Sequence, residues 1–308
     1  MTLEQLRVFL EVARRQHVTR AARALNLTQS AVSASLAALE ARHGVQLFDR
    51  TGRGIALTPE GRAFLPEAQA VLDRAEAART LLADLGREPR GRLRIHASQT
   101  VASHWLPARL VMLAERHPLV STELRVANTR QVADAVAGGA ADLGLVEGEI
   151  AHQALTRQVV ARDRLVLVMA PDHPLGALAQ AGAGAPVTPA CPAPDQLAAH
   201  PWILREPGSG TRAEFEAWLA SRGMGTGGLR IALELPSNEA VLGALAHSRC
   251  LGALSHRAVA AAIAAGQVRA LALPGAERAF WVLTDPARHR TRAVAALLGL
   301  LGAGPQGG

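Results

Sequence analysis

The part of the sequence that most constrains the fold is residues 18–58, where two short apolar helical patterns meet at a polar corner. Asn26 tolerates the left-handed backbone that ends a helix, and Thr28 is a good N-cap for the next one, predicted over residues 29–43. A basic, glycine-containing stretch over residues 50–58 predicts a hairpin. Together these features predict a winged helix-turn-helix, a module that places its second helix in the DNA major groove.

The helix predicted over residues 29–43 has two unlike faces. One face carries apolar residues at i, i+4 and i+7 and must face a core. The other begins with small or polar side chains, which let the backbone approach a groove floor closely, whereas the arginines of the hairpin suit phosphate or minor-groove contacts. The residues predicted to contact DNA are Thr28, Gln29, Ser30, Ser33, Arg50 and Arg53.

The N-terminal sequence FLEVARRQHVTRAARALNLTQSAVSASLAALEARHGVQLFDRTGRGIALTPEGRAFL resembles the DNA-binding domain of LysR-type transcriptional regulators. The similarity is continuous over residues 9–65 and includes the motifs TQSAVS, LFDR and LTPEG. Many members carry Arg or Gln just after the position of Ser33, but this chain has Ala34 and Ser35 there. Direct base readout from that point is weakened, which leaves more of the selectivity to the remaining polar residues and to DNA shape.

A long amphipathic helix is predicted from residue 59 to about residue 85. Its apolar stripe needs a cover, which could be a second copy of the helix or the chain's own C-terminal part. The resemblance implies the first, an antiparallel linker-helix dimer that presents two reading helices to an inverted-repeat operator. We therefore expect a DNA-binding domain over residues 1–58, a linker helix and hinge over residues 59–91, and an effector domain over residues 92–308.

The pattern of residues 92–308 predicts two α/β subdomains, because an alternation of predicted strands and helices is interrupted once along the sequence and then resumes. Lobe one is expected at about residues 92–163 and 269–302, and lobe two at about residues 164–268. A low-complexity segment, residues 176–194, is expected to form a surface insertion. ADLGLVEG and LREPGSGTR resemble the effector domain of the LysR-type subgroup that includes sulfur- and carbon-assimilation regulators. That resemblance implies a two-lobed fold similar to periplasmic solute-binding proteins, behind an all-α winged helix-turn-helix.

Polar residues recur in both lobes where strands lead into helices, and free N–H groups at such places favour anions. Each residue alone is more often a plain helix cap, but the repetition across two lobes favours a binding site. Arg205 and Arg212 could neutralise an anion, whereas Glu147 could instead favour an amine or a hydroxyl, and the sequence leaves this choice open. The predicted effector-binding residues are Ser98, Gln99, Thr100, Glu147, Ser209, Gly210, Thr211, Ser237 and Asn238.

Composition narrows the function further. The net charge of +7 suits an anionic partner, and every one of the 33 basic residues is Arg. Cys191 and Cys250 lack metal-ligand spacing, and GxSxG and P-loop motifs are absent, so we expect no metal, no cofactor and no catalysis. Without a secretion signal or a long apolar run, a cytoplasmic location is expected.

The predicted function is therefore that of a transcriptional regulator. Its expected partners are double-stranded DNA, a small effector for which an anion is favoured, a homodimer or homotetramer mate, and RNA polymerase, with no membrane. The alternative is a solute-binding or enzymatic α/β protein whose helical N-terminus is incidental.

Overall fold

The structure is a computed structural model that describes residues 1–51, 54–84, 88–148, 150, 152–179 and 191–303. The chain divides into two compact units, residues 1–85 and residues 86–308, and each is described separately. Among the described residues, none of the helices combines the length and apolar character needed to cross a membrane.

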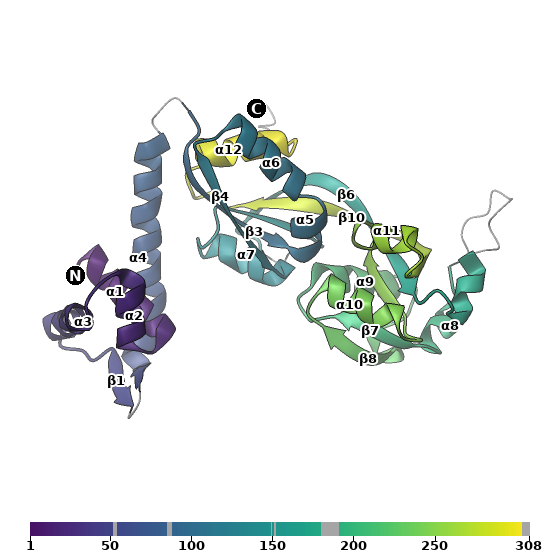
Figure 1. The fold of residues 1–308 in the computed structure, drawn as a ribbon, viewed down its shortest axis with the longest axis horizontal. Helices are drawn as coiled ribbons and strands as arrows, with labels where there is room; N and C mark the ends of the chain where they lie inside the picture. Colours follow the sequence, from purple (N-terminus) through teal and green to yellow (C-terminus); the bar gives the residue numbers. More distant parts are fainter. Residues whose placement is uncertain (52–53, 85–87, 149, 151, 180–190, 304–308) are drawn as a thin grey trace. The chain divides into compact units, whose positions relative to one another are not determined.

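The first unit is built from three helices and a hairpin, followed by a long helix (Figure 1). Its elements are α1 (Leu3–Arg15), α2 (Val18–Leu25), α3 (Gln29–His43), β1 (Phe48–Thr51), β2 (Gly54–Leu57) and α4 (Pro59–Asp84). Phe9 lies at the centre of the core, where its ring contacts Phe48 and Phe64 at centroid distances of 5.4 and 5.1 Å. This cluster joins α1 to the hairpin and to the start of α4, so the core fixes the hairpin beside the helices.

The predicted corner between α2 and α3 is confirmed. Asn26 ends α2 in the left-handed conformation with φ 55°. The side chain of Thr28 accepts a hydrogen bond of 3.2 Å from the N–H of Ala31 and caps α3, which ends at the left-handed Gly44. Local chemistry therefore sets the end of α2 and both the start and the end of α3.

The long helix α4 starts where it does because Thr58 and Gly61 fit closely against the hairpin entry. Thr58 Oγ1 accepts from the N–H of Gly61 (2.9 Å) and donates to the backbone oxygen of Gln46 (2.8 Å). A Cβ atom on Gly61 would lie 2.1 Å from the backbone oxygen of Leu47, so only glycine fits there. The N-terminal half of α4 packs on the core of this unit, whereas Leu82 in its last turns is 69% exposed.

The second unit contains a mixed sheet of six described strands in the order β4-β3-β5-β10-β6-β9, and a parallel pair, β7 and β8. The strands are β3 (Gly91–Ser98), β4 (Val120–Ala127), β5 (Leu143–Glu147), β6 (Thr156–Met169), β7 (Pro201–Arg205), β8 (Arg230–Leu235), β9 (Gly252–Ser255) and β10 (Arg269–Thr284). β3 pairs parallel to β4 and β5, whereas β10 pairs antiparallel to β5 and β6.

The helices of this unit cover two separate cores, which define two lobes (Figure 1). Lobe one holds β3, β4 and β5 with α5 (Gln99–His104), α6 (Pro107–Arg116), α7 (Thr129–Ala137) and α12 (Arg292–Leu300). Lobe two holds β7, β8 and β9 with α8 (Pro194–Ala198), α9 (Gly210–Ala220), α10 (Asn238–Ala246) and α11 (His256–Ala264), and with the 3-10 helices η1 (Pro174–Ala179) and η2 (Thr226–Gly228). β6 and β10 run through both lobes.

The structure differs from the sequence prediction in three places. The sequence pattern predicts two strands, over residues 268–273 and 279–283, but they are one continuous strand, β10, because both halves pair with β6 across a register shift between Ala272 and Glu277. The apolar run over residues 164–169 predicts a strand there, but β6 begins eight residues earlier, at Thr156. The first residues of the expected insertion belong to η1, and its part at residues 180–190 lies outside the described residues.

Candidate functional site

The polar face of α3 is exposed, as expected. Thr28, Gln29, Ser30 and Ala34 are exposed and Ser33 is half-buried. A depression of about 730 Å³ lies between α2, α3 and the hairpin, and its lining includes Thr19, Gln29, Ser33 and Gly54. The first unit therefore presents the start of α3 at the edge of a concave surface.

Glu40 holds the hairpin at a fixed place beside α3. Its Oε1 accepts hydrogen bonds from the backbone N–H groups of Leu47 (2.7 Å) and Phe48 (3.2 Å). The backbone of the predicted residue Arg50 pairs with Ile55 in the hairpin, whereas the other predicted arginine, Arg53, lies outside the described residues.

His17 is a lining residue of this depression that the sequence analysis missed. It precedes α2 at the N-cap position without making a side-chain capping bond. Its Nδ1 atom is buried and, within the described chain, has no hydrogen-bond partner. In the sequence, only its position one residue before a helix points to a role for His17, and this indication is weak because many residue types occupy N-cap positions.

In the second unit, the predicted effector residues form two hydrogen-bonded groups that join the lobes. The first group is centred on the buried carboxylate of Glu147, at the end of β5. It accepts from the hydroxyl of Ser98 in lobe one and from Thr211 Oγ1 in lobe two (3.3 Å). Thr129 Oγ1 donates to the backbone oxygen of Glu147 at 2.9 Å.

The second group is centred on Asn238, the first residue of α10. Its backbone N–H donates to Gln99 Oε1 at 2.7 Å, and its Nδ2 donates to Thr100 Oγ1 at 3.1 Å. Its Oδ1 accepts from Arg205 Nη1 at 2.6 Å. Because Gln99 and Thr100 begin α5 in lobe one, these bonds form a second bridge between the lobes.

The other predicted residues play different parts. Ser237 caps α10 by accepting from the N–H of Ala240 (3.0 Å), whereas Ser209 is buried without a side-chain cap bond to α9. Gly210 lies so close to lobe one that a Cβ atom there would be 2.2 Å from the backbone oxygen of Glu147. The α9 N-terminus therefore packs directly against the end of β5.

Arg205 and Arg212, which the sequence suggested as residues that could neutralise an anion, are both already paired with carboxylates. Arg205 Nε lies 2.8 Å from Glu206, and Arg212 Nε lies 2.8 Å from Glu216. A third arginine, Arg278 on β10, was missed by sequence reasoning and lies fully buried beside the first group.

Arg278 connects that group to the strands that run through both lobes. Its Nε donates to Asp163 Oδ2 on β6 at 2.9 Å, and its Nη1 donates to Thr211 Oγ1 at 3.1 Å. Nη1 also lies 4.0 Å from Glu147 Oε1. Serine and threonine hydroxyls, two carboxylates and one guanidinium thus meet where β3, β5, β6, β10 and α9 come together, out of contact with solvent. No group of three or more metal-ligating side chains occurs in the described chain.

A DNA-reading fold followed by a two-lobed α/β unit defines a class of regulator, and the comparisons with known proteins identify the family. Residues 3–62 match the family of bacterial regulatory helix-turn-helix proteins of the LysR family, and residues 86–305 match the LysR substrate binding domain. The chain belongs to the LysR family of DNA-binding transcriptional regulators.

Curated relatives agree with this assignment. The chain is 36% identical over 297 residues to the uncharacterized HTH-type transcriptional regulator YeiE of Escherichia coli (strain K12). The aligned region covers 96% of this chain and 94% of the relative. It is 32% identical over 241 residues to the RuBisCO operon transcriptional regulator of Allochromatium vinosum, covering 78% and 75% of the two chains. The predicted resemblance to carbon-assimilation regulators is thereby confirmed.

Solved structures show the same fold at low sequence identity. Full-length CbnR, crystallised in complex with its target DNA, has a TM-score of 0.70 at 20% identity and covers 98% of this chain and 99% of its own. A full-length point mutant of OxyR from Pseudomonas aeruginosa has a TM-score of 0.69 at 22% identity, covering 98% and 94%. The predicted fold class is confirmed.

Proposed function

We propose that this regulator reads an inverted-repeat operator with the start of α3 and the hairpin, and that a small effector bound between its two lobes controls the response. The contacts to DNA are assigned to Thr28, Gln29, Ser30, Ser33, Arg50 and Arg53. The observation that carries the DNA half is the exposed, small and polar start of α3 beside a concave surface. Such a surface admits a DNA backbone and groove edge without steric obstruction.

Selectivity in this proposal comes mainly from shape and from paired half-sites. Ala34 gives α3 no long side chain at a position well placed for base edges, so few bidentate base contacts are available. His17 also lines the depression, together with the predicted DNA-contacting residues Gln29 and Ser33.

The proposed oligomer is a dimer, or a tetramer of two dimers, built on α4. Leu81 and Leu82 are 40% and 69% exposed near the end of the helix, and covering them with a second copy would remove apolar surface from water. The solved complex of CbnR with target DNA supports operator binding by a protein of this fold.

The proposed effector site is the junction of the lobes, lined by Ser98, Gln99, Thr100, Glu147, Ser209, Gly210, Thr211, Ser237 and Asn238. What supports it is that residues from three helix starts, those of α5, α9 and α10, and from the end of β5 meet across the two lobes. A ligand that changes these bonds changes how the lobes hold together, which is the kind of two-state element that a regulator needs. An anion is the favoured effector class. The proposal also includes contacts to RNA polymerase, a cytoplasmic location and a lack of catalytic activity.

A gel-shift assay with the DNA upstream of the regulator's own reading frame tests the DNA half. We expect a sequence-selective shift at moderate salt, and the absence of one would refute the proposal. Arg53→Ala should weaken binding to all DNA alike and reduce the salt dependence, because it removes a phosphate contact. For the effector half, Thr100→Ala and Ser209→Ala should reduce the effector response while operator binding persists.

A further inference from the structure

A buried guanidinium with an unused donor lies at the junction of the two lobes. The side chain of Arg278 is 0% exposed. Its Nε and Nη2 atoms both lie 2.9 Å from the same oxygen, Asp163 Oδ2, and Nε makes the hydrogen bond. Nη2 is buried and has no hydrogen-bond partner among the residues that the structure describes. Asp163 Oδ2 thus neutralises the charge at Nη2 without accepting a hydrogen bond from it, and a buried N–H group that lacks such a bond is costly, so an additional acceptor oxygen would be favourable here.

Glu147 already supplies one carboxylate to the donors around Arg278. It accepts from the hydroxyls of Ser98 and Thr211, and its Oε1 lies 4.0 Å from Arg278 Nη1. Two hydroxyls and a guanidinium, provided by both lobes, are the set of groups that binds an oxyanion. In this structure the protein's own side chain fills that role.

The charges at the junction show why a second anion cannot simply be added. Glu147 and Asp163 bring two negative charges and Arg278 brings one positive charge, all three buried. Arg257 lies 3.9 Å from Asp163 but is 42% exposed, so solvent screens much of its effect. An incoming anion would therefore be repelled while the Glu147 carboxylate remains in place.

Given the proposed effector site at this junction, we infer that Arg278 is the residue that recognises an anionic effector and that Glu147 is a built-in competitor. The Glu147 carboxylate holds Ser98, Thr211 and Arg278 while no effector is bound. An oxyanion with at least two free oxygens, such as a carboxylate, a sulfate or a phosphate, binds by displacing it. Closure of the lobes then depends on an exchange of one carboxylate-like group for another rather than on filling an empty cavity.

Chemical rescue of a Glu147→Ala variant of the full-length chain tests this inference. Removing the carboxylate leaves its partners for a small anion from solution, with formate as the probe. We expect formate to raise the melting temperature of the variant when it replaces chloride at constant ionic strength. By calorimetry, formate should bind this variant at least tenfold more tightly than the wild type, because one repelling charge is gone. Adding Arg278→Met to Glu147→Ala should abolish the gain.

Glu123→Ala is the matched control, because Glu123 is a carboxylate of the same lobe that pairs with Arg92 and Arg125 at the surface. It should show no formate dependence. Formate binding to Glu147→Ala no tighter than to the wild type, or equally tight after loss of Arg278, would overturn the inference.

Should Glu147→Ala fail to fold, Glu147→Gln keeps the side-chain shape and removes the charge, with inorganic sulfate as its probe. An affinity at least tenfold above the wild type is expected, and an unchanged affinity overturns the inference. Rescue that occurs without any effect of anions on operator binding would instead contradict the proposed effector function, so the two failures can be told apart.

Discussion

Replacing Gly210 by alanine should force the two lobes apart, and the structure sets the size of the effect. The added Cβ would lie 2.2 Å from the backbone oxygen of Glu147 and 2.5 Å from Thr129 Oγ1, whereas ordinary contact begins at 3.4 Å. A backbone oxygen cannot rotate away, so α9 must move by about 1.2 Å. That shift would also break the 3.3 Å hydrogen bond from Thr211 to Glu147.

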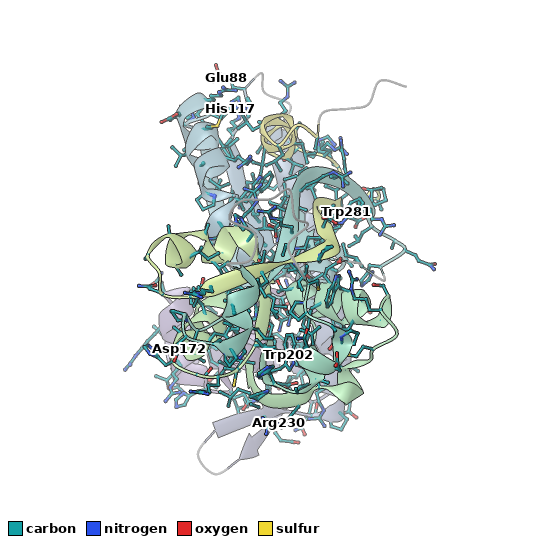
Figure 2. The ribbon with its side chains drawn as sticks, turned by 90° about the vertical axis from the view of Figure 1, so that its right-hand side faces the viewer. Glu88, His117, Asp172, Trp202, Arg230 and Trp281 are labelled. Carbon is teal, nitrogen blue, oxygen red and sulfur yellow. The ribbon has the colours of Figure 1, made fainter. Side chains whose placement is uncertain are left out.

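Overpacking of this kind costs about 1–3 kcal/mol, and the lost hydrogen bond adds about 1 kcal/mol. A domain of this size loses roughly 2–4 °C in melting temperature per kcal/mol, so the expected decrease is about 4–16 °C. Tryptophan fluorescence is the assay of choice because all four tryptophans lie in the second unit (Trp202 and Trp281 are labelled in Figure 2).

Gly243→Ala in α10 is the matched control, because a Cβ atom there would have nothing within 4 Å. Alanine is favoured over glycine inside a helix by up to about 1 kcal/mol, so this variant should melt at the same temperature or higher. Equal melting temperatures for Gly210→Ala and the wild type would refute the argument from close contact.

Two further predictions concern other parts of the chain. Gly61→Ala would place a Cβ atom 2.1 Å from the backbone oxygen of Leu47. Thermal unfolding followed by far-ultraviolet circular dichroism should therefore show the first unit destabilised by about 1–3 kcal/mol. An unchanged melting temperature would contradict this prediction. Burial, and then the neighbouring His200, lower the pKa of His173 in the folded state, so the unfolded chain takes up its proton first as the pH falls below the ordinary value of 6.5. Urea unfolding should therefore show a stability that is complete above that pH and decreases below it, by at most about 1.4 kcal/mol per pH unit for this group. In His173→Asn the decrease should be smaller, and an equally steep decrease would show that His173 is not its source.

Features set by nearby residues were predictable from the sequence. The corner between α2 and α3 depends on Asn26 and Thr28, whose effects on the backbone are local. The start of α4 depends in the same way on Thr58, which caps it. These positions were predicted to the residue because capping needs only three or four neighbours in the sequence.

Features that depend on distant partners were predicted incompletely or missed. β10 is continuous because β6 supports both of its halves, which no periodicity within residues 269–284 reveals. Arg278 has the sequence features of a surface residue, and it is buried because Asp163, 115 positions away, neutralises it. Gln99 and Asn238 were both expected at a site, but their direct hydrogen bond across the lobes follows only from how the lobes meet.

The course of β6 and β10 has a consequence for how such regulators can diversify. Lobe two is one uninterrupted stretch of chain between the two strands, and its ends are neighbours, because Met169 and Arg269 are paired across the ladder. The whole lobe is thus an insertion with adjacent entry and exit points. Recombination could exchange it as a cassette by rejoining two neighbouring strands, giving a new effector preference to an unchanged DNA-binding unit.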